Sequence, residues 1–211
     1  YFKDIEHIVK SFKEFVMNIP KKGIVIAFGE NPFVKEALKG LTNVITYGYT
    51  SSNDFYAENI SFDDNGFPEY DICHEGKVLC HLHLGVPGEH NVLNSMAAYV
   101  TSSYLGVNDE VIASTLKAFR GTHRRFDFTG VTRNGVRIVD DYAHHPTEIK
   151  ATLAAASNVK HNKLRVVFQP HTYTRTKALF DDFIDSFDHV DSLIITDIYA
   201  AREKDVYGVS S

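Results

Sequence analysis

Titratable side chains are concentrated in residues 140–150, DDYAHHPTEIK, which hold two adjacent acids, a tyrosine and two adjacent histidines. Imidazole and phenol groups can donate hydrogen bonds to an anion, and imidazole can also transfer a proton or bind a metal. An ordinary connector between a strand and a helix would have the same composition, because Pro146 and Glu148 suit a first helical turn. The other loops decide between these two interpretations.

Two more polar loops, QPHTYTR (169–175) and DIYAARE (197–203), follow the next two predicted strands. The carboxyl ends of parallel strands meet at one edge of a sheet, where open α/β sheets bind their ligands. Residues in these three loops that can hold phosphate or carboxylate are Asp141, His144, His145, His171, Arg175, Asp197, Tyr199, Arg202 and Glu203. Their shared position favours a functional site.

Three kinds of chemistry compete for such residues. Zinc binding by His144 and His145 is disfavoured, because adjacent histidines tend to point apart and no HxxxH or CxxC spacing accompanies them. A nucleophilic triad would need Ser or Cys on a strand-to-helix elbow, which none of the three loops contains. His81 and His83 share one strand face, but no third ligand is evident, so we expect solvent-facing side chains. The favoured function is the orientation of anionic groups by cations and hydrogen-bond donors.

Strands and helices alternate in the second half of the chain. A hairpin is signalled by Asn134-Gly135, the preferred pair for a two-residue turn. The elements expected after that turn are strand 136–141, helix 147–157, strand 164–169, helix 174–187 and strand 192–198. This order predicts a parallel sheet with right-handed crossovers.

The first half begins with helical apolar spacing over residues 4–19, which gives a helix with a face to bury and Asp4 as its N-cap. A strand, helix, strand unit follows over residues 23–48, and antiparallel strands follow from residue 54. A turn at Glu75-Gly76 would place Cys73 opposite Val78, so the two cysteines are expected to be ordinary thiols. Two helices come next, the second opened by an Asn108-Asp109 cap, and a domain boundary is expected at residues 120 and 121.

Composition excludes several classes of protein. The chain has 211 residues, 44% of them hydrophobic, and a net charge of -5 with a pI near 6.1. An acidic protein with this apolar fraction is globular and is unsuited to general binding of nucleic acid or anionic membranes. No apolar run approaches a membrane span, and the amphipathic start is unlike a signal sequence, so we expect a cytoplasmic protein.

Five motifs, in order and spacing, resemble those of the Mur ligase family: GEHNVLNSMAA, GTHRRFDF, VDDYAHHPTEI, VFQPHTYTRT and DIYAARE. The resemblance covers nearly the whole chain. It implies an α/β fold, with residues 1–120 forming part of the central ATPase domain. Residues 121–211 would form part of a Rossmann-like, parallel-sheet C-terminal domain opened by a β-hairpin.

The activity implied by the resemblance is ATP-dependent ligation. ATP and Mg2+ would convert the carboxylate of UDP-N-acetylmuramate to an acyl phosphate, which the amine of L-alanine attacks. FQPHTYTRT is similar to the alanine-adding branch, whereas DDYAHHPTEI is shared with the ligase that recycles murein tripeptide. That recycling ligase, and a non-catalytic nucleotide- or anion-binding domain, are the alternatives. Small molecules, and neither nucleic acids nor membranes, are the expected partners.

The resemblance also implies roles for individual residues. The positions matching adenine, phosphate and ribose contacts of ATP are His90, Asn91, Asn94, Arg125 and Asp141. The positions matching the muramoyl and amino-acid site are Tyr142, His144, His171 and Arg175, of which the last three would be catalytic. Thr172 departs from the arginine found in some members, which puts one substrate contact in doubt.

A phosphate-binding GxxxxGK[ST] loop is absent from the sequence, because Gly76-Lys77 is followed by Val78. The resemblance places that loop and the Mg2+ ligands upstream of Tyr1, so no metal ligand is expected in this chain. The chain is therefore expected to be an internal piece of a longer enzyme and to be inactive alone.

Overall fold

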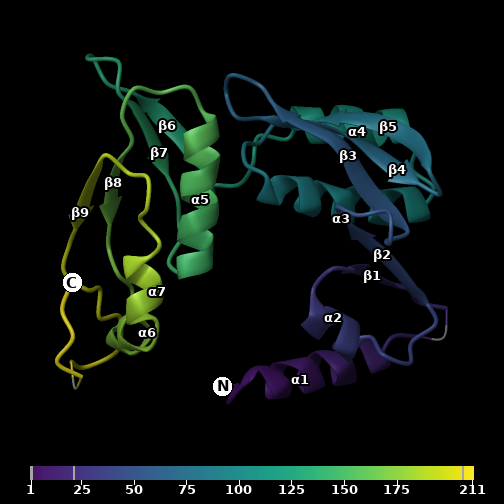
Figure 1. The fold of residues 1–211 in the computed structure, drawn as a ribbon, viewed down its shortest axis with the longest axis horizontal. Helices are drawn as coiled ribbons and strands as arrows, with labels where there is room; N and C mark the ends of the chain where they lie inside the picture. The colour runs from purple at the N-terminus through teal and green to yellow at the C-terminus, as the bar shows by residue number, and fades with distance from the viewer. Residues whose placement is uncertain (1, 21, 206) are drawn as a thin grey trace. The chain divides into compact units, whose positions relative to one another are not determined.

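The computed structural model describes residues 2–20, 22–205 and 207–211, which divide into two compact units (Figure 1). Unit 1 comprises Tyr1–Ser61, Pro68–Val86 and His90–Phe119. Unit 2 comprises Phe62–Phe67, Pro87–Glu89 and Arg120–Ser211. None of the described helices is long and apolar enough to cross a membrane.

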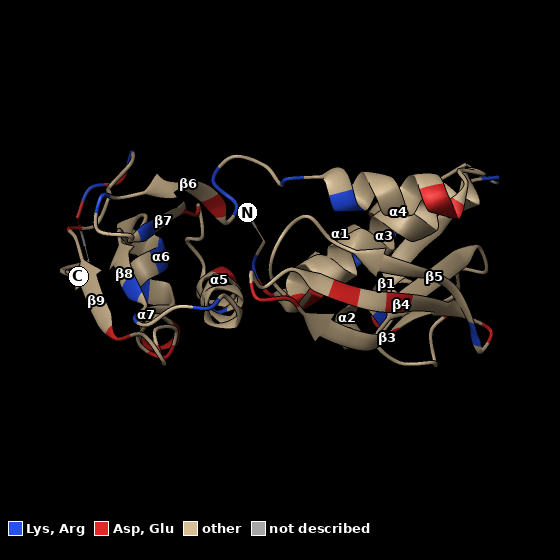
Figure 2. Cartoon of the chain, turned by 90° about the horizontal axis from the view of Figure 1, so that it is seen from above, with Lys and Arg blue, Asp and Glu red and all other residues tan. Residues whose placement is uncertain are grey.

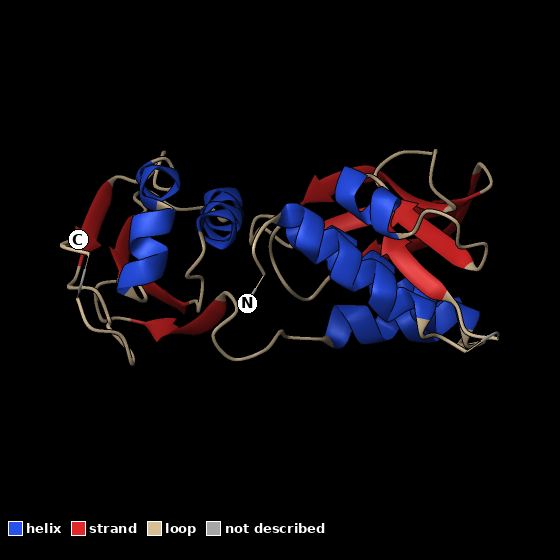
Figure 3. Cartoon of the chain, turned by 90° about the horizontal axis from the view of Figure 1, so that it is seen from below, coloured by secondary structure: helices blue, strands red, loops and turns tan. Residues whose placement is uncertain are grey.

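Unit 1 is a five-stranded sheet with helices packed against it (Figure 3). Its elements are α1 (Ile5–Met17), β1 (Val25–Phe28), α2 (Pro32–Ala37), β2 (Val44–Gly48), β3 (Phe55–Phe62), β4 (Pro68–His74), β5 (Lys77–His83), α3 (His90–Tyr104) and α4 (Asp109–Ala118). The strand order is β1-β2-β3-β4-β5, in which β1, β2 and β3 run parallel and β5 pairs antiparallel with β4. The predicted change from a parallel to an antiparallel half is confirmed.

The core of unit 1 lies between this sheet and α3 and α4. Tyr70, Ile72 and Leu82 are fully buried on the strands, and Met96 and Tyr99 are fully buried on α3. Each such side chain contributes about 1.5–3 kcal/mol by leaving water. The exposed positions of α3 include His90, Asn94 and Thr101.

Local predictions in unit 1 are confirmed at three points. Cys73 pairs with Val78, and both cysteines are free. The Asp4 side chain accepts a hydrogen bond from His7 N at 2.8 Å, and that of Asn108 accepts one from Glu110 N at 2.8 Å. The expected burial of α1 is wrong, because none of its residues is buried. Ile8, Val9 and Val16 are half-buried, whereas Phe12 is 57% and Phe15 is 70% exposed.

Glu30 follows β1, and its carboxylate accepts hydrogen bonds that fix the loop after β2. Its Oε1 accepts hydrogen bonds from Tyr49 N and Thr50 N, both at 2.7 Å, and from Asn53 Nδ2 at 3.0 Å. A Cβ at Gly48 would lie 2.6 Å from Glu30 Oε1, so a side chain at this position would displace the carboxylate. Burial opposes ionisation of Glu30, but the hydrogen bonds from Thr50, Tyr49 and Asn53 outweigh it and lower the pKa. The ionised carboxylate is therefore the form that holds the loop.

Replacing Glu30 with glutamine is expected to lower the free energy of unfolding by about 1–2 kcal/mol near neutral pH, because one charged acceptor serves several donors. A lowered folded-state pKa stabilises the protein above the carboxyl's unfolded pKa, and this contribution is lost as pH falls through the folded pKa. Urea unfolding should therefore show a smaller difference between wild type and variant below about pH 4. Glu36→Gln, which breaks only an exposed pair with Lys39, is the control, and an equal difference at both pH values would contradict the expectation.

Unit 2 consists of a hairpin followed by alternating helices and strands. Its elements are β6 (Asp127–Val131), β7 (Arg137–Asp140), α5 (Pro146–Asn158), β8 (Arg165–Phe168), α6 (Tyr173–Ala178), α7 (Phe180–Ile184) and β9 (Ser192–Ile195). The predicted hairpin is confirmed as the antiparallel β6–β7 pair, with Gly135 in its turn at a φ of 79°. β8 and β9 pair parallel, from Arg165 opposite Ser192 to Phe168 opposite Ile195.

Two details of unit 2 differ from the prediction. In the described residues β7 pairs only with β6, so the parallel sheet has two strands where three were expected. All of β7 is exposed, and its hairpin partner is closer in sequence than β8, so the local pairing needs less loop closure. The helix predicted over residues 174–187 breaks at Leu179, whose φ of -119° leaves the helical region. Leu179 instead packs against the core formed by Ile149, Leu153, Phe168 and Phe183.

Candidate functional site

The three strand-end loops of unit 2 meet through a row of rings. The ring centroids of His144 and His171 are 6.1 Å apart, which joins the loop after β7 to the loop after β8. The centroids of His171 and Tyr199 are 5.5 Å apart, which joins the loop after β8 to the loop after β9. Tyr142 lies edge-on to His144 at 5.3 Å. We call Tyr142, His144, His171, Tyr199 and Arg175 the anion-binding cluster, after the ligand that we propose for it.

Arg175 contributes the cation of this cluster from the first turn of α6. Its Nη1 donates to His171 Nδ1 at 3.3 Å. Because His171 accepts at Nδ1, the neutral ring carries its proton on Nε2, where it is a donor. None of the ion pairs among the described residues involves Arg175. A guanidinium beside an imidazole donor is suited to binding carboxylate or phosphate oxygens.

His144 is oriented by the backbone of its own loop. Its Nδ1 donates to the carbonyl oxygen of Tyr142 at 2.8 Å, which leaves Nε2 of the neutral ring as a hydrogen-bond acceptor. His145 has a different role. It is the N-cap of α5, and its Nδ1 accepts a hydrogen bond from Thr147 N at 3.3 Å. The two adjacent histidine rings therefore have different hydrogen-bond partners.

Glu148 organises this loop, a role that the sequence interpretation missed. Its Oε2 accepts from the backbone N–H of His144 at 3.1 Å and of His145 at 3.3 Å, and its Oε1 lies 3.4 Å from Arg125 Nη1. Burial opposes ionisation, but the His144 N–H, the His144 ring and Arg125 outweigh it, so the pKa of Glu148 is lowered. The spacing of His145 and Glu148 as a capping box was the signal that could have revealed it.

Asp141 holds the backbone around Arg125. Its Oδ2 accepts from Phe126 N and its Oδ1 from Ala143 N, both at 2.7 Å. Arg124 and Phe126, on either side of Arg125, have φ values of 60° and 48° in the left-handed region. Such residues are strained unless the surroundings fix them. Both Asp141 oxygens therefore have structural partners, and contact with a nucleotide would use their remaining lone pairs.

Replacing Asp141 with asparagine is expected to lower the free energy of unfolding by about 1–3 kcal/mol, because the amide NH2 cannot accept one of the two backbone N–H groups. Urea unfolding monitored by circular dichroism measures this loss. The neighbouring Asp140→Asn, at an exposed position, should change it little. Equal stability of the two variants would show that the hydrogen bonds to Phe126 and Ala143 contribute nothing measurable.

The predicted adenine contacts lie in unit 1, at the start of α3. His90 and Asn94 are exposed and Asn91 is half-buried, and Asn94 Nδ2 donates to Asn91 Oδ1 at 3.0 Å. The structure brings these three residues together on one helix. Amide groups on an outward helical face can exchange hydrogen bonds with a nucleobase.

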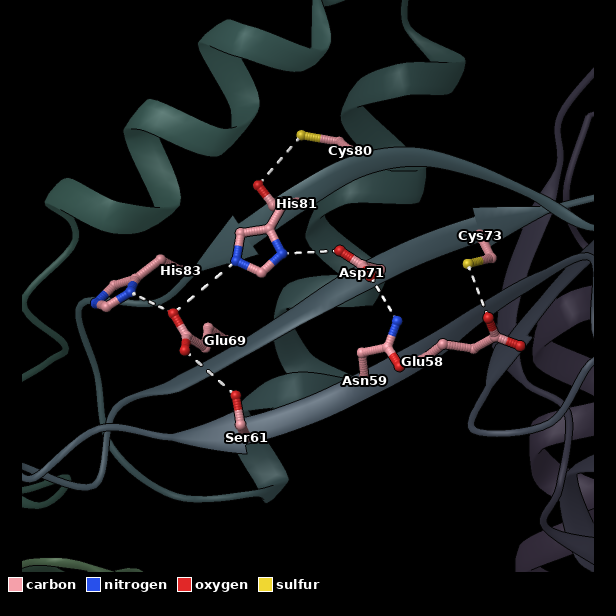
Figure 4. A network of polar contacts seen from close by, with 9 residues as sticks. All are labelled: Glu58, Asn59, Ser61, Glu69, Asp71, Cys73, Cys80, His81 and His83. Carbon is pink, nitrogen blue, oxygen red and sulfur yellow. Dashed lines mark hydrogen bonds and ion pairs between the residues drawn. The ribbon is translucent and has the colours of Figure 1, made fainter.

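His81 and His83 lie in a polar network on the sheet face opposite the core of unit 1 (Figure 4). His81 Nδ1 lies 2.8 Å from Asp71 Oδ1, and His83 Nδ1 lies 3.4 Å from Glu69 Oε2. The acids of β4 are visible as separate red segments of that strand in Figure 2. Hydrogen bonds from Asn59 and His81 lower the pKa of Asp71. No three His, Cys, Asp or Glu side chains within the described ranges are arranged to hold a metal ion.

Two protein-family models match the chain. Residues 1–102 match the Mur ligase middle domain, and residues 124–208 match the glutamate ligase domain of Mur ligases. The chain belongs to the Mur ligase family. The matched ranges fall almost wholly in unit 1 and unit 2, respectively.

Several curated Mur ligases are similar over the whole chain. UDP-N-acetylmuramate–L-alanine ligases are 47% identical in Caldanaerobacter subterraneus and 49% identical in Clostridium acetobutylicum, each over 100% of this chain and 46% of the relative. That of Alkaliphilus metalliredigens is 50% identical over 97% of this chain and 45% of the relative. The chain thus spans about half the length of these relatives.

Solved structures of Mur ligases share the fold. The crystal structure of UDP-N-acetylmuramate-alanine ligase from Thermotoga maritima has a TM-score of 0.76 and 27% identity, covering 93% of this chain and 42% of that one. A murein peptide ligase from Psychrobacter arcticus has a TM-score of 0.61 at 22% identity, covering 93% of this chain and 48% of that one, which shows likeness of fold alone. The mixed α/β class predicted from the sequence is confirmed.

Proposed function

We propose that the full-length protein containing this chain joins L-alanine to the carboxylate of UDP-N-acetylmuramate at the expense of ATP, in peptidoglycan synthesis. The observation that carries this proposal is the 47–50% identity to ligases of that name along essentially the whole chain. The anion-binding cluster supports it, because phosphorylation of a carboxylate and attack on an acyl phosphate both gather negative charge. We place the enzyme in the cytoplasm.

Donors of the anion-binding cluster would orient the charged substrate. Arg175 supplies the fixed cation, and the Nε2–H of His171 supplies a neighbouring donor. His144, held at Nδ1 by Tyr142 O, presents Nε2 to accept or return a proton. Charge-assisted hydrogen bonds of this kind are roughly twice as strong as neutral ones. The protein's contribution is therefore positioning and electrostatic stabilisation, with no covalent enzyme intermediate.

Nucleotide contacts are proposed for both units. His90, Asn91 and Asn94 would contact adenine, Arg125 would contact phosphate, and Asp141 would contact the ribose. The amides and the exposed guanidinium of Arg125 fit such a ligand chemically. We propose Mg2+ as the metal that accompanies ATP, and we assign no ligand for it to a residue of this chain. We keep residues 1–120 and 121–211 as the proposed domain ranges.

The test is ligation by the full-length protein with ATP and UDP-N-acetylmuramate. L-alanine is compared with L-alanyl-γ-D-glutamyl-diaminopimelate, and phosphate release and the ligated product are both measured. Product with L-alanine, at higher kcat/KM than with the tripeptide, supports the proposal. Preference for the tripeptide would assign a recycling ligase, and nucleotide binding without product would assign a non-catalytic domain.

A further inference from the structure

The first turn of α6 has no cap of its own. Thr172 occupies the N-cap position, makes no side-chain capping hydrogen bond, and has a φ of 70° in the left-handed region. That conformation costs about 1–3 kcal/mol for a residue other than glycine. The first N–H groups of a helix also need partners from outside the helix. Another segment must therefore hold this turn, which carries Arg175.

Glu203, in the loop after β9, accepts the hydrogen bonds that fix this turn. Its Oε2 accepts from Thr174 N at 2.9 Å, and its Oε1 accepts a short hydrogen bond from Thr174 Oγ1. These bonds from the Thr174 hydroxyl and N–H lower the pKa of Glu203, and the charge of Arg175 acts in the same direction. Glu203 is thus an ionised acceptor, 29 residues away in sequence, for the turn that lacks a local cap.

Two backbone contacts join the same loops nearer the sheet. Thr172 N donates to Tyr199 O at 2.9 Å, and Tyr199 N donates to Pro170 O at 2.8 Å. His171 and Tyr199 form an isolated parallel bridge at this point. The backbone contacts fix His171, and Glu203 fixes the following turn, so the two ends of the His171–Arg175 segment are held separately.

Glu203 is poorly suited to contact the substrate itself. A carboxylate would repel the carboxylate and phosphate groups that the proposed function brings to this cluster. Both of its oxygens already accept from Thr174. Among the described ion pairs none joins Glu203 to Arg175, so the guanidinium is not neutralised by direct pairing with it.

We propose that Glu203 is a positioning residue, which fixes the first turn of α6 through Thr174 and thereby keeps Arg175 beside His171 to receive the anionic substrate. This inference rests on the proposed function and deepens it. It adds a residue that touches neither substrate nor nucleotide and acts through Arg175.

The first experiment measures kcat/KM for UDP-N-acetylmuramate in the full-length protein. Glu203→Ala is expected to lose about 10- to 100-fold, because displacing a binding group by about 1 Å can cost 100-fold. Glu203→Gln, whose amide oxygen still accepts from Thr174 N, should recover most of the loss. Asp188→Asn removes another exposed carboxylate of unit 2 and serves as the control. Equal losses in the alanine and glutamine variants, or no loss in either, would overturn the proposal.

A double-mutant cycle separates positioning from general stability. If Glu203 acts through Arg175, Glu203→Ala should cause less than about a twofold further loss in an Arg175→Ala background. Multiplication of the two losses would overturn the proposal, because it would show that Glu203 acts independently of Arg175.

A third measurement does not depend on catalysis. In NMR spectra of the full-length protein labelled at histidine, Glu203→Ala should shift the ring resonances of His171, the hydrogen-bond partner of Arg175, and leave those of His81 unchanged. An unmoved His171 signal would overturn the proposal even in an active enzyme. If the wild-type protein makes no ligated product, the proposed function fails, and the NMR result still decides whether Glu203 positions the pair.

Discussion

Replacing Arg175 with alanine in the full-length protein lowers kcat/KM for ligation by about 100- to 1000-fold, the usual effect of removing one preorganised donor from a developing charge. The reason is geometric as well as electrostatic, because Arg175 Nη1 also holds His171 Nδ1 at 3.3 Å. Steady-state kinetics with varied UDP-N-acetylmuramate measure the loss.

Two further variants make the Arg175 result specific. Arg175→Lys keeps the charge but loses the planar fork, so it should recover only part of the activity. Arg133→Ala removes an exposed arginine from the hairpin turn and should be close to wild type. If Arg133→Ala and Arg175→Ala lose equal activity, net charge rather than the cluster controls the rate.

The 211-residue chain alone is expected to show no ligase or ATPase activity. Its sequence contains no GxxxxGK[ST] loop, and its described residues contain no group arranged for a metal ion. Electrostatic stabilisation of the transferred phosphoryl group therefore lacks its main partners. Nucleotide binding should be weak, with a Kd of roughly 1 mM, or about -4 kcal/mol.

Calorimetry with ATP and Mg2+, beside a phosphate-release assay, tests both parts of this expectation. A no-protein sample sets the background of the assay. Turnover above that background, abolished by Arg125→Ala, would mean that the chain holds a complete active site and would contradict the expectation.

Much of the candidate site could be predicted from the sequence, because strand ends are visible as a change from apolar to polar residues. That change placed His144 and His171 at one sheet edge, and the structure brings their rings to 6.1 Å. The role of Glu148 had a local signal in the capping-box spacing, but the role of Glu203 could not be predicted in this way. Glu203 reaches the backbone N–H of Thr174, 29 residues away in sequence, and composition and periodicity do not encode that choice.

The fold was predictable where short-range turn and cap residues determine it. It was less predictable where pairing and packing depend on segments that are distant in sequence. The Asn134-Gly135 turn and the Asn108 cap are short-range features, and both are present. The pairing of β7 with β8 and the continuity of α6 through Leu179 depend on how separate segments pack. The burial of α1 failed for a similar reason, since helical spacing shows an apolar face without showing what covers it.

The contacts that position His144 join residues close in sequence, whereas those that position His171 and Tyr199 join residues far apart. This difference bears on the order of folding. The β6–β7 hairpin and the capping box of His145 and Glu148 join close neighbours in the chain. Contacts of this kind form quickly, whereas contacts between distant residues wait for loop closure. We therefore expect the loop that carries Tyr142 and His144 to form early. We expect their contacts with His171 and Tyr199 to form late, because those contacts require the longer loop closures that bring β8 and β9 together.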